Sequence, residues 1–87
     1  MATKIVMPPL SETMDEGTIS GWLKKEGEVV ERGEPVLEVE TDKAVVQVEA
    51  FGSGVLRKII VEAGEAVPIG ELLGIIAEPD EDISGLL

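Results

Sequence analysis

The chain has 87 residues, a net charge of −11 and a pI near 4.2, and it contains neither cysteine nor histidine. A chain of this length forms one small domain with a single modest core. Without Cys it lacks disulfides and a thiolate nucleophile, and without His it lacks the commonest general base and the commonest metal ligand. Catalysis by this chain alone is therefore not expected. The negative charge argues against nucleic acid and anionic membranes as partners, because both are bound mainly through Lys and Arg.

Short runs rich in Val and Ile follow one another along the chain, separated by Gly, Pro, Glu and Asp, and such runs predict strands. No segment sustains a helical period. About eight strands result, a number that suits a small sandwich or a flattened barrel. The predicted strands cover residues 5–7, 18–23, 29–30, 35–41, 44–50, 55–61, 67–69 and 72–77.

An internal repeat appears when the sequence is shifted by 37 positions. Each half carries the pattern G-E-x-V-x-x-G-E, beginning at Gly27 in the first half and at Gly64 in the second. So many identities at one offset indicate a structural duplication. The sequence therefore predicts an all-β fold, a flattened barrel of two four-stranded antiparallel sheets with internal pseudo-two-fold symmetry. The identical pairs are Gly17 and Gly54, Gly27 and Gly64, Glu28 and Glu65, Val30 and Val67, Gly33 and Gly70, and Glu34 and Glu71.

The stretch VLEVETDKAVVQVEA, residues 36–50, reads as a hairpin with Asp42 and Lys43 in its turn. Apolar and polar residues alternate on both sides, which leaves Lys43 exposed at the apex. Two-residue hairpin turns usually contain glycine or asparagine, but a type I turn needs neither, and we expect the Asp42 side chain to bind the turn amides. An exposed turn lysine is most often only solvated, so these residues alone give Lys43 no function.

The predicted symmetry places the end of the second half, near Pro79, at the pole opposite Lys43. Lys43 is therefore expected to point away from both chain termini. The strand at residues 5–7 runs toward the Lys43 pole, so the loop after it, PPLSETMDEG, should arrive beside Lys43. This loop is longer than its repeat counterpart FGSG, and a loop insertion on a symmetric scaffold favours a role in recognition.

Residues 3 to about 79 resemble the lipoyl domain of a dihydrolipoyl acyltransferase, the E2 component of 2-oxo acid dehydrogenase complexes, and look most like the pyruvate dehydrogenase type. The resemblance is carried by MPPLSETMDEGTISGWLKKEGEVVERGEPVLEVETDKA, with ETDKA at residues 40–44 as its centre. It implies the fold known as a barrel-sandwich hybrid. It further implies that Lys43 bears lipoic acid in amide linkage, as N6-lipoyllysine, and that Glu40, Asp42, Ala44, Gly27 and Gly54 help to present it, with Glu40 helping the modifying enzyme to choose it. It also implies recognition by the E1 component through the loop residues Pro8, Pro9, Leu10, Ser11, Glu12, Thr13, Met14, Asp15 and Glu16.

The function implied by this resemblance is that of a carrier that is not itself catalytic. An acyl group would come from the thiamine diphosphate-dependent E1, pass to coenzyme A at the E2 catalytic core, and leave an arm that E3, dihydrolipoyl dehydrogenase, reoxidises. A lipoylating enzyme is a further implied partner, and the isolated domain is expected to be monomeric. No apolar run approaches the roughly 18 residues of a membrane span and no signal peptide is apparent, so an intracellular location is expected, in bacterial cytoplasm or, in a eukaryote, the mitochondrial matrix.

Three other interpretations remain open. A biotin carrier domain shares the barrel and the apical lysine, but such domains resemble M-K-M there, whereas Lys43 lies between Asp42 and Ala44. The glycine cleavage H protein is a second lipoyl carrier, but it is longer and has helical additions that this sequence lacks. An unmodified barrel could serve as an adapter or assembly module. No metal site is expected, because the acidic candidates lack the spacing of a calcium loop; these are Asp15, Glu16, Glu38 and Glu40.

After Pro79 the chain becomes acidic and loses its strand pattern. We therefore expect residues 1–79 to form the lipoyl domain and residues 80–87 to begin an acidic linker. A complete acyltransferase would need a subunit-binding domain and a catalytic domain as well, so the chain is expected to be a fragment.

Overall fold

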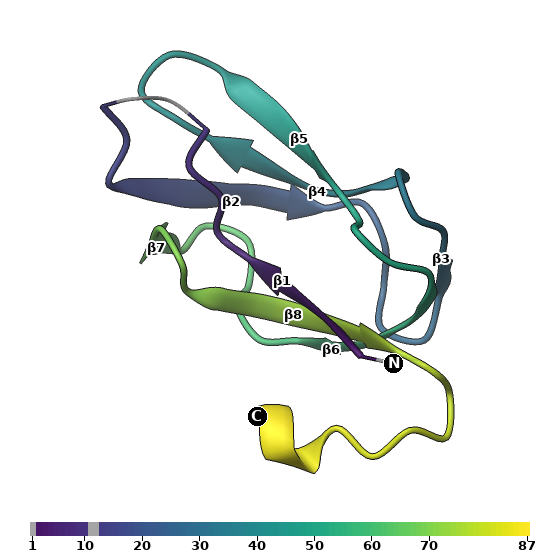
Figure 1. Cartoon of the computed structure of the whole chain (residues 1–87). Helices are drawn as coiled ribbons and strands as arrows, with labels where there is room; N and C mark the ends of the chain where they lie inside the picture. Colours follow the sequence, from purple (N-terminus) through teal and green to yellow (C-terminus); the bar gives the residue numbers. More distant parts are fainter. Residues whose placement is uncertain (1, 11–12) are drawn as a thin grey trace.

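Two four-stranded antiparallel sheets face each other in the computed structural model, which describes residues 2–10 and 13–87 (Figure 1). The strand orders are β1-β8-β6-β3 and β5-β4-β2-β7. The predicted fold class and the eight predicted strands are confirmed, with bounds that differ by at most two residues. The strands are β1 (Thr3–Val6), β2 (Glu16–Trp22), β3 (Val29–Val30), β4 (Pro35–Glu40), β5 (Val45–Glu49), β6 (Gly54–Ile59), β7 (Ala66–Pro68) and β8 (Leu72–Ala77).

The two sheets show the two-fold symmetry that the repeat predicts. Exchanging β1 with β5, β8 with β4, β6 with β2 and β3 with β7 converts one strand order into the other. Hydrogen bonds follow the same rule: the Gly27 N–H donates to the Leu56 carbonyl at 2.8 Å, and the Gly64 N–H donates to the Ile19 carbonyl at 2.7 Å. Both glycines are left-handed, with φ of 96° and 95°, a conformation that other residues rarely adopt. The repeated glycines thus form equivalent turns in the two halves.

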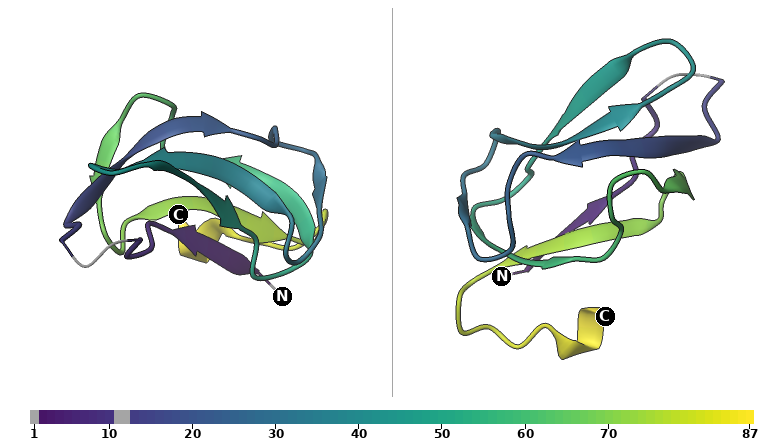
Figure 2. Two further views of the ribbon diagram at one scale, coloured as in Figure 1. Left: turned by 90° about the horizontal axis from the view of Figure 1, so that it is seen from above. Right: turned by 180° about the vertical axis from the view of Figure 1, so that it is seen from behind.

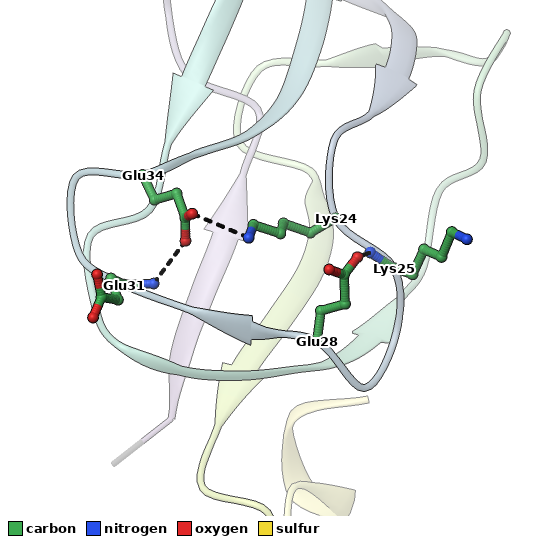
Figure 3. A network of polar contacts seen from close by, with 5 residues as sticks. All are labelled: Lys24, Lys25, Glu28, Glu31 and Glu34. Atoms are coloured by element: carbon green, nitrogen blue, oxygen red, sulfur yellow. Dashed lines mark hydrogen bonds and ion pairs between the residues drawn. The ribbon is translucent and has the colours of Figure 1, made fainter.

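Glutamates of the repeat close the two turns on either side of β3 through their side chains (Figure 3). The Lys25 N–H donates to Glu28 Oε1 at 2.7 Å, and the Glu31 N–H donates to Glu34 Oε1 at 3.1 Å. Lys24 Nζ lies 3.0 Å from Glu34 Oε2. The Glu31 N–H first, and then Lys24, hold the pKa of Glu34 below its ordinary value. These contacts fix two turns whose residues are mostly exposed.

The core between the sheets is aliphatic, since the chain has only two aromatic residues, but two methionines also belong to it. Met7 is fully buried and Met14 nearly so. Gly17 leaves room for them, because a Cβ at this position would lie 2.7 Å from both Met14 Cε and Val39 Cγ1. The largest branched residues that are fully buried in this core are Ile19, Val30, Val36, Leu37, Val39, Leu56, Leu73 and Ile76.

The two aromatic residues lie away from the centre of the core. Trp22 is half-buried at the end of β2, and its Nε1–H donates to the Val61 carbonyl at 2.8 Å. Phe51 is 77% exposed. Branched aliphatic residues and methionines therefore supply the packing between the sheets.

The residues after β8 turn back beneath the first sheet (Figures 1 and 2). They end in a short 3₁₀ helix, η1 (Ser84–Leu86), and the preceding Ile83 is buried against Ile75 and Ala77. The strand pattern ends where predicted, but the segment packs against the barrel instead of extending from it. The division into a domain of residues 1–79 and a linker remains a prediction. Within the described residues, no helix is long and apolar enough to cross a bilayer.

Candidate modification site

Lys43 lies in the turn that joins β4 to β5. The two strands stay paired as far as Glu40, which lies opposite Val45, so residues 41–44 form the whole connection. The Lys43 side chain is exposed, and no carboxylate in residues 2–10 or 13–87 forms an ion pair with its Nζ. The predicted exposure of this amine at the hairpin apex is thus found in the structure.

Thr41 holds the turn together through its backbone and its hydroxyl. The hydroxyl oxygen accepts hydrogen bonds from the N–H of Lys43 at 3.2 Å and from the N–H of Ala44 at 3.1 Å. The hydroxyl and the backbone N–H of Thr41 both donate to the Ala44 carbonyl, at 2.9 and 2.8 Å. Since the described non-glycine residues all have negative φ, this turn forms without the left-handed backbone that favours glycine.

The expectation that Asp42 would bind the turn amides is corrected, because the Thr41 hydroxyl fills that role. Asp42 is exposed, and its carboxylate makes no hydrogen bond within the part of the chain that the structure describes. Thr41 is therefore a site residue that the sequence interpretation missed. The available signal was its position, since Ser and Thr hydroxyls just before a turn often bind backbone amides two and three residues on.

The loop after β1 lies beside the hairpin, as the predicted symmetry requires (Figure 1). Thr13–Thr18 and Glu40–Asp42 together line a groove of about 390 Å³. Neither Lys nor Arg is among these residues. The groove is therefore acidic, and it borders the residue that precedes Lys43 in the chain. Its exposed carboxylates belong to Asp15, Glu16, Glu40 and Asp42.

One residue of this loop anchors it to the core. Met14 is buried beneath the loop, and the Leu10 N–H donates to its sulfur at 3.4 Å. Of the other residues predicted for recognition, Pro8 and Leu10 are half-buried, whereas Pro9, Thr13, Asp15 and Glu16 are exposed. Ser11 and Glu12, also predicted for recognition, lie outside the described residues.

The two glycines predicted to help present the lysine lie at the other end of the barrel. Gly54 pairs with Val30, and a Cβ on it would lie 2.9 Å from the Ala77 carbonyl oxygen. Gly27 forms the turn that bonds to Leu56. The structure therefore does not bring either glycine to the hairpin. Their regular spacing from Lys43 reflects the scaffold, which needs a left-handed turn at Gly27 and a close strand approach at Gly54.

The comparisons with known proteins begin with the family described as "Biotin-requiring enzyme", whose profile matches residues 3–76. The "Dihydrolipoyllysine-residue acetyltransferase component of pyruvate dehydrogenase complex" of Rickettsia bellii is 46% identical over 99% of this chain. That of Zymomonas mobilis is 42% identical over 97%. The mouse "Pyruvate dehydrogenase protein X component, mitochondrial" is 48% identical over 91%. The chain spans about a fifth of these relatives, namely 21%, 19% and 16% of their lengths.

Two solved structures share this fold. The lipoyl domain of the 2-oxoglutarate dehydrogenase complex from Azotobacter vinelandii has a TM-score of 0.71 and 41% identity, over 86% of this chain and 95% of that chain. The urea carboxylase of Kluyveromyces lactis has a TM-score of 0.75 and 26% identity, over 88% of this chain and 6% of that chain. The first is similar over nearly its entire length, and the second contains the same fold within a much longer protein.

Proposed function

Because the chain belongs to the biotin/lipoyl attachment family and is a lipoyl domain of a 2-oxo acid dehydrogenase E2, we propose that Lys43 is the residue that carries its cofactor. The cofactor of lipoyl domains is lipoic acid, bound covalently to a lysine. One observation carries the assignment: within the motif ETDKA, Lys43 is an exposed amine at the apex of a turn fixed by Thr41.

The residues around Lys43 fit a covalently attached arm. The amine is exposed, so a lipoylating enzyme can reach it without disturbing the core. The backbone beneath it is fixed, because Thr41 binds the amides of both Lys43 and Ala44. When bound, lipoic acid supplies the disulfide chemistry of acyl transfer. This chain supplies position and a recognition surface, so the domain acts without a catalytic group of its own.

The domain is then an acyl carrier between three active sites. It receives an acyl group from the thiamine diphosphate-dependent E1, presents it to coenzyme A at the E2 catalytic core, and visits E3 for reoxidation. A short flexible tether can raise the effective concentration of the attached group at each active site to about the millimolar range. The carrier therefore need not bind any partner tightly. Bacterial cytoplasm or the mitochondrial matrix is the location that this role implies.

The acidic groove beside Lys43 is the surface that these enzymes would recognise. Its exposed carboxylates favour a partner that presents a basic face, because complementary charge accelerates encounter and fixes orientation. We assign Glu40 to recognition by the lipoylating enzyme. The exposed side chains of Pro9, Thr13, Asp15 and Glu16 are assigned to recognition by E1, with Met14 holding their loop in place.

Intact mass measurement tests the assignment of Lys43. Coexpression with a lipoate ligase should add one lipoyl increment to the chain, and Lys43→Arg should abolish it while the far-UV spectrum stays unchanged. Lys25→Arg is the matched control, since Lys25 is also an exposed lysine in a turn and should leave the increment intact. A biotinyl increment, or a lipoyl group on another lysine of the Lys43→Arg variant, would contradict the proposal.

The curated relatives named above are components of pyruvate dehydrogenase complexes, which supports pyruvate as the substrate class. We propose that this domain serves the same class. The lipoylated domain should accept acetyl groups from a pyruvate-specific E1 much faster than succinyl groups from a 2-oxoglutarate-specific E1, as followed by mass. Faster succinylation would assign the domain to the class of the Azotobacter protein instead.

A further inference from the structure

The outer faces of the two sheets differ at positions that the repeat makes equivalent. Glu38 and Glu40 of β4 correspond to Ile75 and Ala77 of β8, at the offset of 37 residues. Glu40 is exposed and Glu38 half-buried, whereas Ile75 and Ala77 are both 0% exposed. Ile75 and Ala77 belong to an apolar cluster separate from the core between the sheets. One half of the scaffold thus carries glutamates where the other half carries a covered apolar face.

The cover is made by the chain itself, by residues 78–87. Ile83, which is 8% exposed, packs in the same cluster as Ile75 and Ala77. The right-hand view in Figure 2 shows this segment running beneath the sheet. Apolar surface is removed from water on both sides of the contact, which favours docking. Partly buried residues complete its margin, namely Ala2, Leu72 and Leu86.

Arg57 of β6 fixes the backbone of this segment. Its Nη1 donates to the Glu78 carbonyl at 2.6 Å and to the Glu81 carbonyl at 2.7 Å, so one guanidinium spans the bend of the segment. The Glu81 N–H in turn donates to the Glu78 carbonyl at 3.1 Å. The repeat equivalent of Arg57 is Ser20, which is exposed and too short for such a bridge. The clamp is therefore a departure from the symmetry, like the apolar face that it closes.

A local turn shapes the last residues for this contact. Asp82 Oδ1 accepts the Ser84 N–H at 3.0 Å, and the Leu86 N–H donates to the Ile83 carbonyl at 2.9 Å. The bonds from Ser84, with Arg57 nearby, lower the pKa of Asp82. This turn brings Ile83 and Leu86, three residues apart, to the same apolar cluster.

We propose that the outer face of β8 is an intramolecular docking surface for residues 78–87, and that the folded domain extends to Leu86 instead of ending at Pro79. The segment that fits is short and bent, with two apolar residues three apart, and Arg57 recognises its carbonyls. While it is docked, the face around Ile75 is closed to other proteins. Partner recognition then falls on the hairpin and the loop beside it. This inference is independent of any modification of Lys43.

Chemical unfolding of truncated and substituted chains tests the docking. Removal of residues 80–87 and the single change Ile83→Asp should each raise the unfolding equilibrium constant by roughly tenfold or more, because a buried apolar contact is lost. Both changes should also increase fluorescence of a dye that binds apolar surface. Leu87→Asp is the matched control, since Leu87 is 66% exposed, and it should unfold like the parent chain. Equal midpoints for the parent, truncated and Ile83→Asp chains would overturn the proposal.

Amide exchange provides a second test that keeps the domain intact. Arg57→Gln should speed exchange of the Glu81 and Leu86 amides, because both belong to the segment that Arg57 clamps. Lys58→Gln, on the neighbouring exposed residue of β6, should leave those rates unchanged. Identical exchange in the two variants would show that Arg57 does not hold the segment.

Discussion

At the residue scale, the hairpin that carries Lys43 depends on one hydroxyl group. The Thr41 hydroxyl accepts two amide hydrogen bonds and donates one to the Ala44 carbonyl. These bonds stabilise a turn that contains no glycine. A fixed turn presents a modifying enzyme with the same backbone at each encounter. The conformation of this turn therefore depends on a residue that precedes Lys43 by two positions.

Replacing that hydroxyl tests its role. Thr41→Val keeps the shape of the side chain but removes the hydroxyl acceptor. We expect the free energy of unfolding to fall by only about 1 kcal/mol, because the exposed amides can bind water in place of the hydroxyl. The amides of Lys43 and Ala44 should exchange faster, and lipoylation should slow. Thr41→Ser keeps the hydroxyl and should behave like the parent chain in urea unfolding, amide exchange and intact mass. Equal behaviour of the Val and Ser variants would exclude this role.

Gly17 provides a second test at this scale. Gly17→Ala would place a methyl group 2.7 Å from Met14 Cε and Val39 Cγ1, and overpacking of this kind typically costs about 1–3 kcal/mol in the free energy of unfolding. Gly21→Ala, on the same strand, meets no atom within 4 Å and should be neutral or slightly stabilising. Urea unfolding of the two variants gives the comparison. A harmless Gly17→Ala would mean that Met14 can move without disturbing the loop it anchors.

At the scale of elements, the stability contributed by the turn before β4 depends on pH through the carboxyl group of Glu34. Its pKa is lowered in the folded chain, chiefly by the Glu31 N–H and then by Lys24. The unfolded chain therefore binds a proton at higher pH than the folded chain does. The stabilising contribution of Glu34 is fully present above the unfolded pKa and is lost as the pH falls through the folded pKa.

The Lys24 contribution can be isolated by substitution. Lys24→Met should raise the pKa of Glu34 only part of the way to its ordinary value, because the Glu31 N–H still binds the carboxylate. Lys25→Met should leave that pKa unchanged, since the Lys25 side chain points away from Glu34 in Figure 3. Carboxyl chemical shifts followed against pH give both values. A full return to the ordinary value in Lys24→Met would show that the backbone bond has no effect.

The sequence predicts elements better than the contacts between them. Val and Ile runs mark the strands because a pleated, half-buried surface suits those residues, and the repeated Gly27 and Gly64 mark turns that need a left-handed backbone. Met14 gives no such signal, because its place in the core depends on the absence of a side chain at Gly17. The docking of Ile83 was missed for the same reason, since it depends on β8 and β6. Alternation predicted that Lys43 is exposed, but only the family resemblance distinguishes it from other surface lysines.

At the scale of the whole molecule, the start of β1 and the end of β8 lie at the pole opposite the hairpin. Thr3 pairs with Ile76 and Val55 with Ala77 at one pole, whereas Glu40 pairs with Val45 next to the turn at the other. Figure 1 shows the N-terminus far from the β4–β5 connection. The surface around Lys43 therefore lies away from the start of β1 and the end of β8.

A fusion experiment tests this separation. A small folded protein attached to the N-terminus should leave the rate of lipoylation within about twofold of the parent rate, because it lies at the pole away from Lys43. The same protein inserted into the loop at residues 8–16 should slow the reaction strongly, since that loop borders the acidic groove. Intact mass against time measures both rates. Equal slowing by the two fusions would show that the modifying enzyme also contacts the other pole.

The opposed poles also have a mechanical meaning. A stiff barrel gripped at one end acts as a lever, so a small rotation at the grip becomes a wide sweep of the amine at the tip. Paired strands connect the start of β1 to the turn at Lys43, so the reach of this amine includes the length of the barrel.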